Sequence, residues 1–444
     1  MSQTKLTGLL LVVVVLLSST FAFAQSVDPQ STLIPIQMKV LDNGLRVIVK
    51  EIPSYPIATV NVWVNVGAKN DPEGYSGLAH FFEHLLFKGT TTRPPGQIAY
   101  EVESLGGYLN AMTSLDYTTY FIVVPSEYVD KAMEVQADAI RNSVFDQAEI
   151  DRERTVIHEE IRLRIDSPQT HLVDMAIREL FPGTVYARPV IGTFEELANV
   201  NRREMLDFHA KYYVPNNMVL VVAGNVNAAE VFSQAERLYG DMVPRSMPSP
   251  DYISMPNLDN VIYLHEERPI QQSYVFLGHP GPGLNTRDAA ALTMTGIILG
   301  GGRSSRLYRQ LVEEEHIVNS VSASYSGFSE IGLFAIMAQL DPENRDRFSE
   351  IVKNELTRLQ NELVNEDELS RARTMARSQL AFSTESSTNV AMYLGQMEIY
   401  GGVMGAVNRS AILEGITADD IQRAAQMYLD PDAYIYSEIM PVGR

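Results

Sequence analysis

A long-range repeat limits what this chain can fold into. A helix that opens at Asn201 and ends before Pro215 is followed by a buried strand, and a similar helix and strand surround Thr417 and Pro431. Asn201 aligns with Thr417 and Pro215 with Pro431, so one shift of 216 residues superposes both segments without a gap. Similarity at one large spacing is typical of repeated structural units. The 444 residues also exceed what one hydrophobic core usually holds. We therefore predict two homologous halves.

Strand and helix patterns define the class of these halves. Met38–Lys50 indicates two strands joined by an Asn43-Gly44 turn, and Ile57–Val66 alternates apolar and polar residues as a strand does. Helical patterns follow in separate runs, which is typical of an α+β fold. We expect each half to be a mostly antiparallel sheet packed with helices. A polar segment with three prolines suggests a linker, giving an N-terminal domain at 25–243, a linker at 244–257 and a C-terminal domain at 258–444.

The first residues have the features of a secretory signal peptide at 1–24. Lys5 precedes an apolar run, and Ala22-Phe23-Ala24 is a small-x-small cleavage pattern. We expect secretion across the inner membrane into the periplasm, without a membrane anchor after cleavage. The chain has no cysteine, so no disulfide contributes to its stability. Its 55 acidic against 35 basic residues argue against nucleic acid as a partner and favour solubility.

One apolar helix, predicted at Gly77–Phe87, carries two imidazoles and a carboxylate. His80, Glu83 and His84 occupy positions i, i+3 and i+4 and so share one face of the helix. The intervening phenylalanines and leucines cover the other faces. A buried helix holds three polar groups only if something satisfies them, and a zinc ion bound by both imidazoles would do so.

A third protein ligand must come from elsewhere, since catalytic zinc usually has three protein ligands and a water. The charged helix predicted at Asp146–Ile165 is the natural donor, because Glu153 and Glu160 are seven residues apart and lie on nearly the same face. Glu83 would accept a proton from the water, in the inverted H-x-x-E-H order known among zinc peptidases. The alternative is a structural helix whose histidines are satisfied by nearby carboxylates.

These segments closely resemble the pitrilysin/insulinase family of zinc peptidases, also called inverzincins. The resemblance rests on His80–Thr90, Asn110–Ser114 and Glu153–Ile161, and it extends to Tyr213–Gly224 and Gly301–Leu307. It covers nearly the whole mature chain. The two-domain length is similar to the bacterial and mitochondrial processing peptidase branch. The resemblance implies a mitochondrial processing peptidase-like metallohydrolase fold with Zn²⁺ as cofactor.

The resemblance also implies roles for individual residues. Glu160 becomes the third metal ligand, with Glu159 as a weaker rival, and Glu153 becomes the carboxylate that supports the site. Asn110 and Ala111 lie on a strand similar to the family's edge strand, which receives the substrate as an added strand. The second half has no metal apparatus, because its corresponding helix, Ala289–Leu299, contains no histidine or carboxylate.

The second half departs from the family pattern at two positions. Relatives that act alone or as homodimers carry an arginine and, seven residues later, a tyrosine that bind substrate near the metal. Val312 and Asn319 occupy these positions here. The departure suggests a divided site, as in mitochondrial processing peptidase, in which a related inactive subunit supplies the Arg/Tyr pair. The alternative is a local shift that places Arg309 or Tyr325 in these roles.

Together these features predict a zinc endopeptidase that hydrolyses extended or unfolded peptides. We expect this chain to be the metal-bearing catalytic subunit of a heterodimer, with a homodimer as the alternative state. A second hypothesis is a non-catalytic binding or assembly subunit of a peptidase-like complex, in which the metal is structural or absent.

Overall fold

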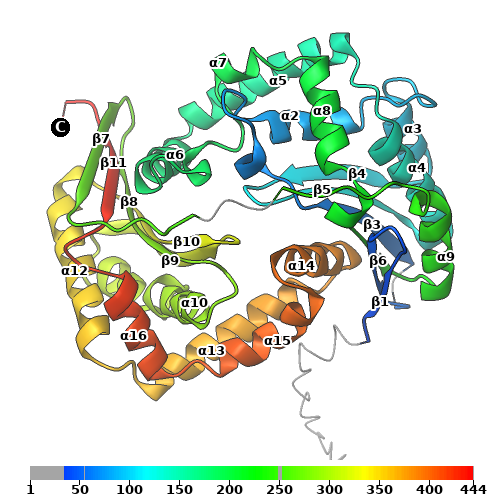
Figure 1. Ribbon diagram of the computed structural model, residues 1–444. Helices are drawn as coiled ribbons and strands as arrows, with labels where there is room; N and C mark the ends of the chain where they lie inside the picture. The colour runs from blue at the N-terminus through cyan, green and yellow to red at the C-terminus, as the bar shows by residue number, and fades with distance from the viewer. Residues whose placement is uncertain (1–34, 55, 249–252, 444) are drawn as a thin grey trace, which may run out of the picture.

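The structure is a computed structural model that describes residues 35–54, 56–248 and 253–443. The predicted signal peptide lies outside the described residues, as does part of the predicted linker. Figure 1 shows two halves side by side, each with a sheet and helices packed on it. The predicted α+β fold class is confirmed.

The N-terminal half is built on a six-stranded sheet in the order β1-β2-β6-β3-β5-β4. Strands β2 and β6 run parallel, and all other neighbours run antiparallel. The predicted hairpin joins β1 and β2, and Gly44 has the left-handed φ of 88° that its turn needs. The strands are β1 (Gln37–Val40), β2 (Arg46–Glu51), β3 (Ile57–Val64), β4 (Tyr108–Thr113), β5 (Thr118–Pro125) and β6 (Met218–Gly224).

The described part of the C-terminal half repeats this topology without a counterpart of β1. Its five-stranded sheet has the order β7-β11-β8-β10-β9, with β7 and β11 parallel and the other pairs antiparallel. The strands are β7 (Ile262–Arg268), β8 (Ser273–Pro282), β9 (Val318–Gly327), β10 (Ile331–Leu340) and β11 (Ile435–Pro441). The 216-residue shift relates helix α8 (Arg202–Tyr212) to α16 (Ala418–Tyr428) at both ends. The sequence repeat is therefore a structural repeat.

One face of each sheet is covered by helices of the same half. In the first half these are α2 (Leu78–Leu86), α3 (Gln97–Ser104), α4 (Val129–Asn142), α5 (Gln147–Asp166), α7 (Phe194–Leu197), α8 and α9 (Ala228–Tyr239). In the second half they include α10 (Arg287–Gly300), α11 (Arg306–Tyr308), the π-helical turn η5 (Arg309–Glu314), α12 (Arg345–Asn361), α13 (Glu366–Phe382), α15 (Val403–Glu414) and α16. Each set encloses one apolar core.

The opposite face of each sheet is covered by a helix from the other half. Helix α14 (Ser387–Tyr400), from the second half, packs on β3 and β6 of the first sheet. Helix α6 (Pro168–Leu180), from the first half, packs on β8 and β11 of the second. Figure 1 shows both helices in these positions. Apolar contacts across the two halves form two further cores. Burial on both faces thus depends on an exchange of helices.

A polar cluster also joins the halves. Asp116, in the turn between β4 and β5, is almost fully buried and accepts a hydrogen bond from Ser329 N at 3.0 Å. Lys69 Nζ lies 2.8 Å from Asp116 Oδ1 and donates to Ser329 Oγ at 2.8 Å. Because Ser329 follows β9, these bonds hold the turn after β4 against the second half. Of the helices in the described part of the chain, none is both long and apolar enough to cross a membrane.

Candidate metal centre and active site

The start of α2 is fixed by a buried carboxyl group. Gly77, the capping residue, has φ 90° and no side chain to cap the helix. Asp71 accepts hydrogen bonds instead, from Gly77 N and Ala79 N, each at 2.8 Å. A Cβ at Gly77 would lie 2.6 Å from Ile191 O, so glycine allows the close approach of the loop before α7. Asp71 thus supplies the cap that Gly77 lacks and orients α2.

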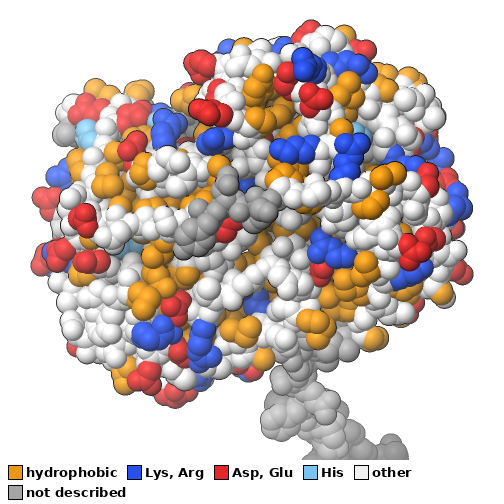
Figure 2. Space-filling model, viewed as in Figure 1, with side chains coloured by type: hydrophobic (Ala, Val, Ile, Leu, Met, Phe, Trp, Pro, Cys, Tyr) orange, Lys and Arg blue, Asp and Glu red, His pale blue; other side chains and the backbone are white. Residues whose placement is uncertain are grey.

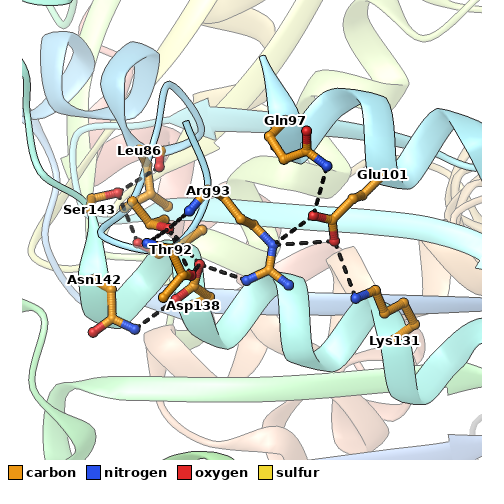
Figure 3. A network of polar contacts seen from close by, with 11 residues as sticks. Leu86, Thr92, Arg93, Gln97, Glu101, Lys131, Asp138, Asn142 and Ser143 are labelled. Carbon is orange, nitrogen blue, oxygen red and sulfur yellow. Dashed lines mark hydrogen bonds and ion pairs between the residues drawn. The ribbon is translucent and has the colours of Figure 1, made fainter. Parts of the chain in front are cut away.

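The end of α2 is fixed by a polar network, shown in Figure 3. Ser143 Oγ donates to Leu86 O at 2.7 Å, which anchors the last turn to the end of α4. In the loop that follows, Arg93 lies between two carboxylates, with Nη1 2.7 Å from Asp138 and Nε 3.2 Å from Glu101. Both ends of the helix that carries His80, Glu83 and His84 are therefore held by buried or half-buried polar groups.

Helices α2 and α5 bring three ligand-type groups together. His80 Nε2 and His84 Nε2 lie 3.7 and 3.6 Å from Glu160 Oε2. In the described part of the chain, this is the one group of three or more such residues spaced to hold an ion, with all ligand atoms within 4.8 Å of one another. Glu153, the other carboxylate considered for the third ligand, is directed at His84 Nδ1 instead, at 3.2 Å.

The spacing fits a metal ion better than a set of hydrogen bonds. Ligands about 2.0–2.2 Å from a tetrahedral zinc are about 3.3–3.6 Å apart, close to the distances found here. As hydrogen bonds, the contacts of Glu160 with the histidines are too long, and His80 Nδ1 is buried without a partner among the described residues. The alternative of histidines satisfied by carboxylates therefore holds only for His84 Nδ1. The residues present fit Zn²⁺.

Electrostatics at the centre suit a cation. Burial, followed by the charge of His84, lowers the pKa of His80 to about 4, so this ring is neutral at physiological pH, as a metal ligand must be. Burial opposes protonation of His84 as well, but the nearby carboxylates of Glu160 and Glu153 outweigh burial and raise the pKa of His84. The close approach of the His84 imidazole lowers the pKa of Glu160.

Glu83 lies on the same face and is held by the edge strand. Thr113 Oγ1, at the end of β4, donates to Glu83 Oε2 at 2.5 Å. Burial raises the pKa of Glu83, although the bond from Thr113 opposes this shift. A carboxyl group with a raised pKa is better suited to accept a proton from water. No role for Thr113 could be predicted from the sequence, because a contact between a strand and a helix 30 residues away leaves no local pattern.

Glu153 supports the centre from behind His84. It is buried, and its second oxygen lies 2.6 Å from Lys88 Nζ, so the carboxylate has a cationic partner on each side when His84 is protonated. A carboxylate on the far nitrogen of a histidine ligand fixes its tautomer and orientation. The ion pair of Lys88 with Glu153 could not be predicted from the sequence. Glu159, the rival for the ligand role, points outward and pairs with Arg162.

The predicted substrate-binding residues lie on a free sheet edge. Strand β4 is the last in its sheet and pairs only with β5. Asn110 is exposed and its side chain accepts a hydrogen bond from Ala111 N at 2.9 Å, whereas the Ala111 side chain packs on the core. The outer backbone edge beside Glu83 is therefore unpaired by any described strand.

The two positions that differ from the family pattern, Val312 and Asn319, lie in the second half. Val312, in η5, packs against the core of that half, and Asn319 is exposed on β9. Of the two proposed substitutes, Tyr325 donates its hydroxyl proton to Pro282 O within its own sheet, and Arg309 is exposed at the start of η5. Tyr325 therefore already has a structural role.

These features define a class. Two imidazoles and a carboxylate that fit a metal ion, with the half-buried carboxyl group of Glu83 beside them, form the site of a metal-dependent hydrolase.

Comparison with known proteins identifies the family. Residues 46–194 match "Insulinase (Peptidase family M16)", and residues 199–376 match "Peptidase M16 inactive domain". An uncharacterized zinc protease of Mycobacterium leprae (strain TN) is 31% identical over 393 residues, 88% of this chain and 88% of that protein. One of Rickettsia felis is 31% identical over 387 residues, 87% of this chain and 93% of that protein. The chain belongs to peptidase family M16, the insulinase family.

A solved structure agrees with this assignment. A protease from Helicobacter pylori superposes with a TM-score of 0.85 and 26% sequence identity, covering 91% of this chain and 99% of that one. The resemblance to the pitrilysin/insulinase family is confirmed, and the protein is a zinc-dependent metallopeptidase. The match to an inactive domain, over residues 199–376, includes α10, which has no histidine and no carboxylate after Asp288.

Proposed function

We propose that this chain is the metal-bearing catalytic subunit of a heterodimeric endopeptidase that hydrolyses extended peptides. One contrast carries the proposal: the donor set on α2 and α5 is complete, whereas Val312 and Asn319 have side chains that cannot replace an arginine and a tyrosine. A related subunit without metal ligands would supply the missing Arg/Tyr pair. The N-terminal residues 1–24 support secretion across the inner membrane, so we propose the periplasm as the place of action.

His80, His84 and Glu160 would hold the Zn²⁺, which supplies Lewis-acid polarisation of the scissile carbonyl and of a water molecule. Three protein ligands would leave the fourth position of a bound zinc for water, as a catalytic zinc requires. This arrangement favours a peptidase over the non-catalytic binding or assembly subunit, in which a fourth protein ligand would close the site.

Glu83 would act as the general base. Its carboxylate takes a proton from the water and returns it to the leaving amine, and Thr113 holds Oε2 in place while it does so. Glu153 keeps the His84 ring oriented through Nδ1.

The free edge of β4 would receive the substrate backbone. A peptide added beside Asn110 and Ala111 would pair with this edge and lie next to Glu83, because Thr113 of the same strand contacts that carboxylate. Backbone pairing needs an extended chain, so folded proteins should be poor substrates. This is the reason for proposing extended or unfolded peptides as the substrate class.

Two variants test the chemistry. Glu83→Gln should abolish hydrolysis yet keep one zinc per chain, because the amide accepts no proton but leaves all three donors intact. Glu159→Gln is the matched control, since that side chain is exposed on α5 beside Glu160 and should keep both zinc and activity. Zinc content by metal analysis and hydrolysis of a quenched fluorescent peptide give the two readouts. Activity in Glu83→Gln would contradict the assigned base.

A separate experiment tests whether a second subunit completes the substrate-binding site. The purified chain alone should cleave slowly, and addition of a related subunit with the Arg/Tyr pair should restore activity. A Val312→Arg, Asn319→Tyr double variant should raise activity of the chain alone. Full activity of the unmodified single chain would show that no partner is needed.

A further inference from the structure

A cavity of about 350 Å³ lies directly beside the candidate metal centre. Thr113, which holds Glu83, forms part of its wall. Arg164, one helical turn beyond Glu160 on α5, forms another part, and its charge acts on both His80 and Glu160. The cavity therefore opens within reach of a peptide bound at β4, close to the bond that Glu83 would cleave.

The charge of this cavity is opposite to that of the whole chain. The lining includes three guanidinium groups and one carboxylate, although the protein carries a net charge of −20. Arg164 Nη2 donates to both oxygens of Asp174, at 3.0 and 3.1 Å, so this carboxylate is already occupied. Figure 2 shows acidic and basic side chains mixed over one face of the molecule, without a comparable excess of one sign.

Among the described residues, no carboxylate forms an ion pair with either of the other two arginines. Arg188 Nη1 donates to the backbone oxygen of Asp71 at 2.7 Å, and the carboxyl group of Asp71 is itself used by the start of α2. Arg178, on α6, is exposed and makes no hydrogen bond or ion pair with any part of the chain that the structure describes. Arg178 is therefore free to bind an anionic group at the mouth of the cavity.

The rest of the wall is mainly apolar. It is formed by side chains from β4, from the turn after it, from α6 and from the second half, including Met112, Leu115, Val173, Ile177 and Phe328. A group that fills such a space needs an apolar stem and a negative end. A peptide offers this chemistry in two forms: a glutamate side chain or its own C-terminal carboxylate.

We propose that this cavity is a specificity pocket for a carboxylate of the peptide substrate, with Arg178 as the residue that recognises it. The proposal rests on the proposed peptidase function and adds a substrate preference to it. Peptides with a carboxylate near the scissile bond bind better than neutral or basic ones. Asp174 cannot reverse this preference, because Arg164 already neutralises it.

Binding to the zinc-loaded Glu83→Gln protein tests the pocket without requiring turnover. Fluorescence anisotropy is measured for a neutral, C-terminally amidated peptide and for versions with one Glu, Gln or Lys at each successive position. A second series has the same neutral sequence with a free C-terminal carboxylate. We expect about threefold to tenfold tighter binding for Glu than for Gln at one position, or for the free over the amidated end. The two series distinguish the source of the carboxylate.

Charge reversal assigns the preference to a residue. Arg178→Glu should remove the preference for the carboxylate and favour Lys at the same position, and Arg178→Gln should remove it without favouring Lys. Arg203→Glu, with the same change on a highly exposed residue of α8 outside the cavity wall, should leave the preference intact. Circular dichroism confirms that each variant is folded.

The outcomes separate the two proposals. Binding of Glu and Gln peptides with equal affinity, with free and amidated ends equal as well, would overturn the pocket while leaving the peptidase function standing. A carboxylate preference that survives Arg178→Glu would overturn the role of Arg178. Failure of every peptide to bind the zinc-loaded protein, with its partner present, would count against the proposed substrate class itself.

Discussion

Replacing Gly395 with alanine tests how the second half packs on the first. Gly395 lies inside α14, where an exposed glycine would be less stable than alanine by about 1 kcal/mol. Here an added Cβ would lie 2.0 Å from Trp63 Nε1 and 2.4 Å from Trp63 Cδ1, whereas carbon atoms in ordinary contact are about 3.5–4.0 Å apart. Trp63 is fully buried and its ring packs on Tyr117, so it cannot move aside freely.

Alanine at position 395 would gain helix propensity but would overlap the Trp63 ring. The steric cost is the larger of these two opposing effects. Overpacking costs typically about 1–3 kcal/mol, and an overlap of this size on a buried indole belongs at the upper end. After the helix propensity gained by alanine, we expect Gly395→Ala to lower the free energy of unfolding by about 2 kcal/mol. Glycine at this position thus allows α14 to lie flat on the indole ring.

Trp63 is the only tryptophan in the chain, so its emission reports this contact directly. Urea unfolding is followed by that emission, and the native spectrum shows whether the indole has shifted. Gly405→Ala is the matched control on α15, because nothing lies within 4 Å of the added Cβ. It should be neutral or stabilising by up to about 1 kcal/mol. Equal stability of the two variants, with an unchanged native spectrum, would refute the packing described for α14.

Three further perturbations test other parts of the molecule. Burial lowers the pKa of His279 to about 4, so the unfolded chain binds a proton first as pH falls. Stability should therefore decline between about pH 6.5 and pH 4 by up to roughly 3 kcal/mol, and denaturant titrations at each pH should show a flatter profile for His279→Gln. Asp138→Ala leaves the half-buried guanidinium of Arg93 with Glu101 alone and should lower the free energy of unfolding by about 2 kcal/mol in thermal unfolding. A loss below about 0.5 kcal/mol would mean that the network is not stabilising. Zinc at 100 times its Kd should stabilise the protein by about 2.7 kcal/mol, and Glu160→Gln should lose most of that shift at the same zinc concentration, unless Glu160 is not a ligand.

The metal helix was predictable because it leaves a local pattern, and the repeat was predictable because its two copies share one constant spacing of 216 residues. Three polar groups on one face of an apolar helix are costly without a partner, so His80, Glu83 and His84 point to one chemistry wherever the helix lies. The grouping of these histidines with Glu160 rather than Glu153 could not be derived from spacing, since both carboxylates lie on one face of α5 and only the packing of α5 on α2 separates them.

Helix α6 could be predicted from the sequence, but the sheet on which it packs could not. Ser167 and Pro168 are a helix start, and Leu172, Ala176 and Leu180 recur every four residues, so the helix itself could have been found. Its partner could not, because the apolar stripe packs on β8 and β11, strands about a hundred and more than two hundred and fifty residues later. No local rule assigns a helix to the sheet of another domain.

The exchange of α6 and α14 has a thermodynamic consequence. Each sheet is buried on both faces only while the other half is folded and in place, so the two sequence repeats share a single free energy of folding. A break in the linker would leave two fragments that stay associated through these helices. Either fragment alone would expose one apolar sheet face, and its exchanged helix, α6 or α14, would have no sheet to pack on. The boundary between the two sequence repeats is therefore not a boundary between independently folding units.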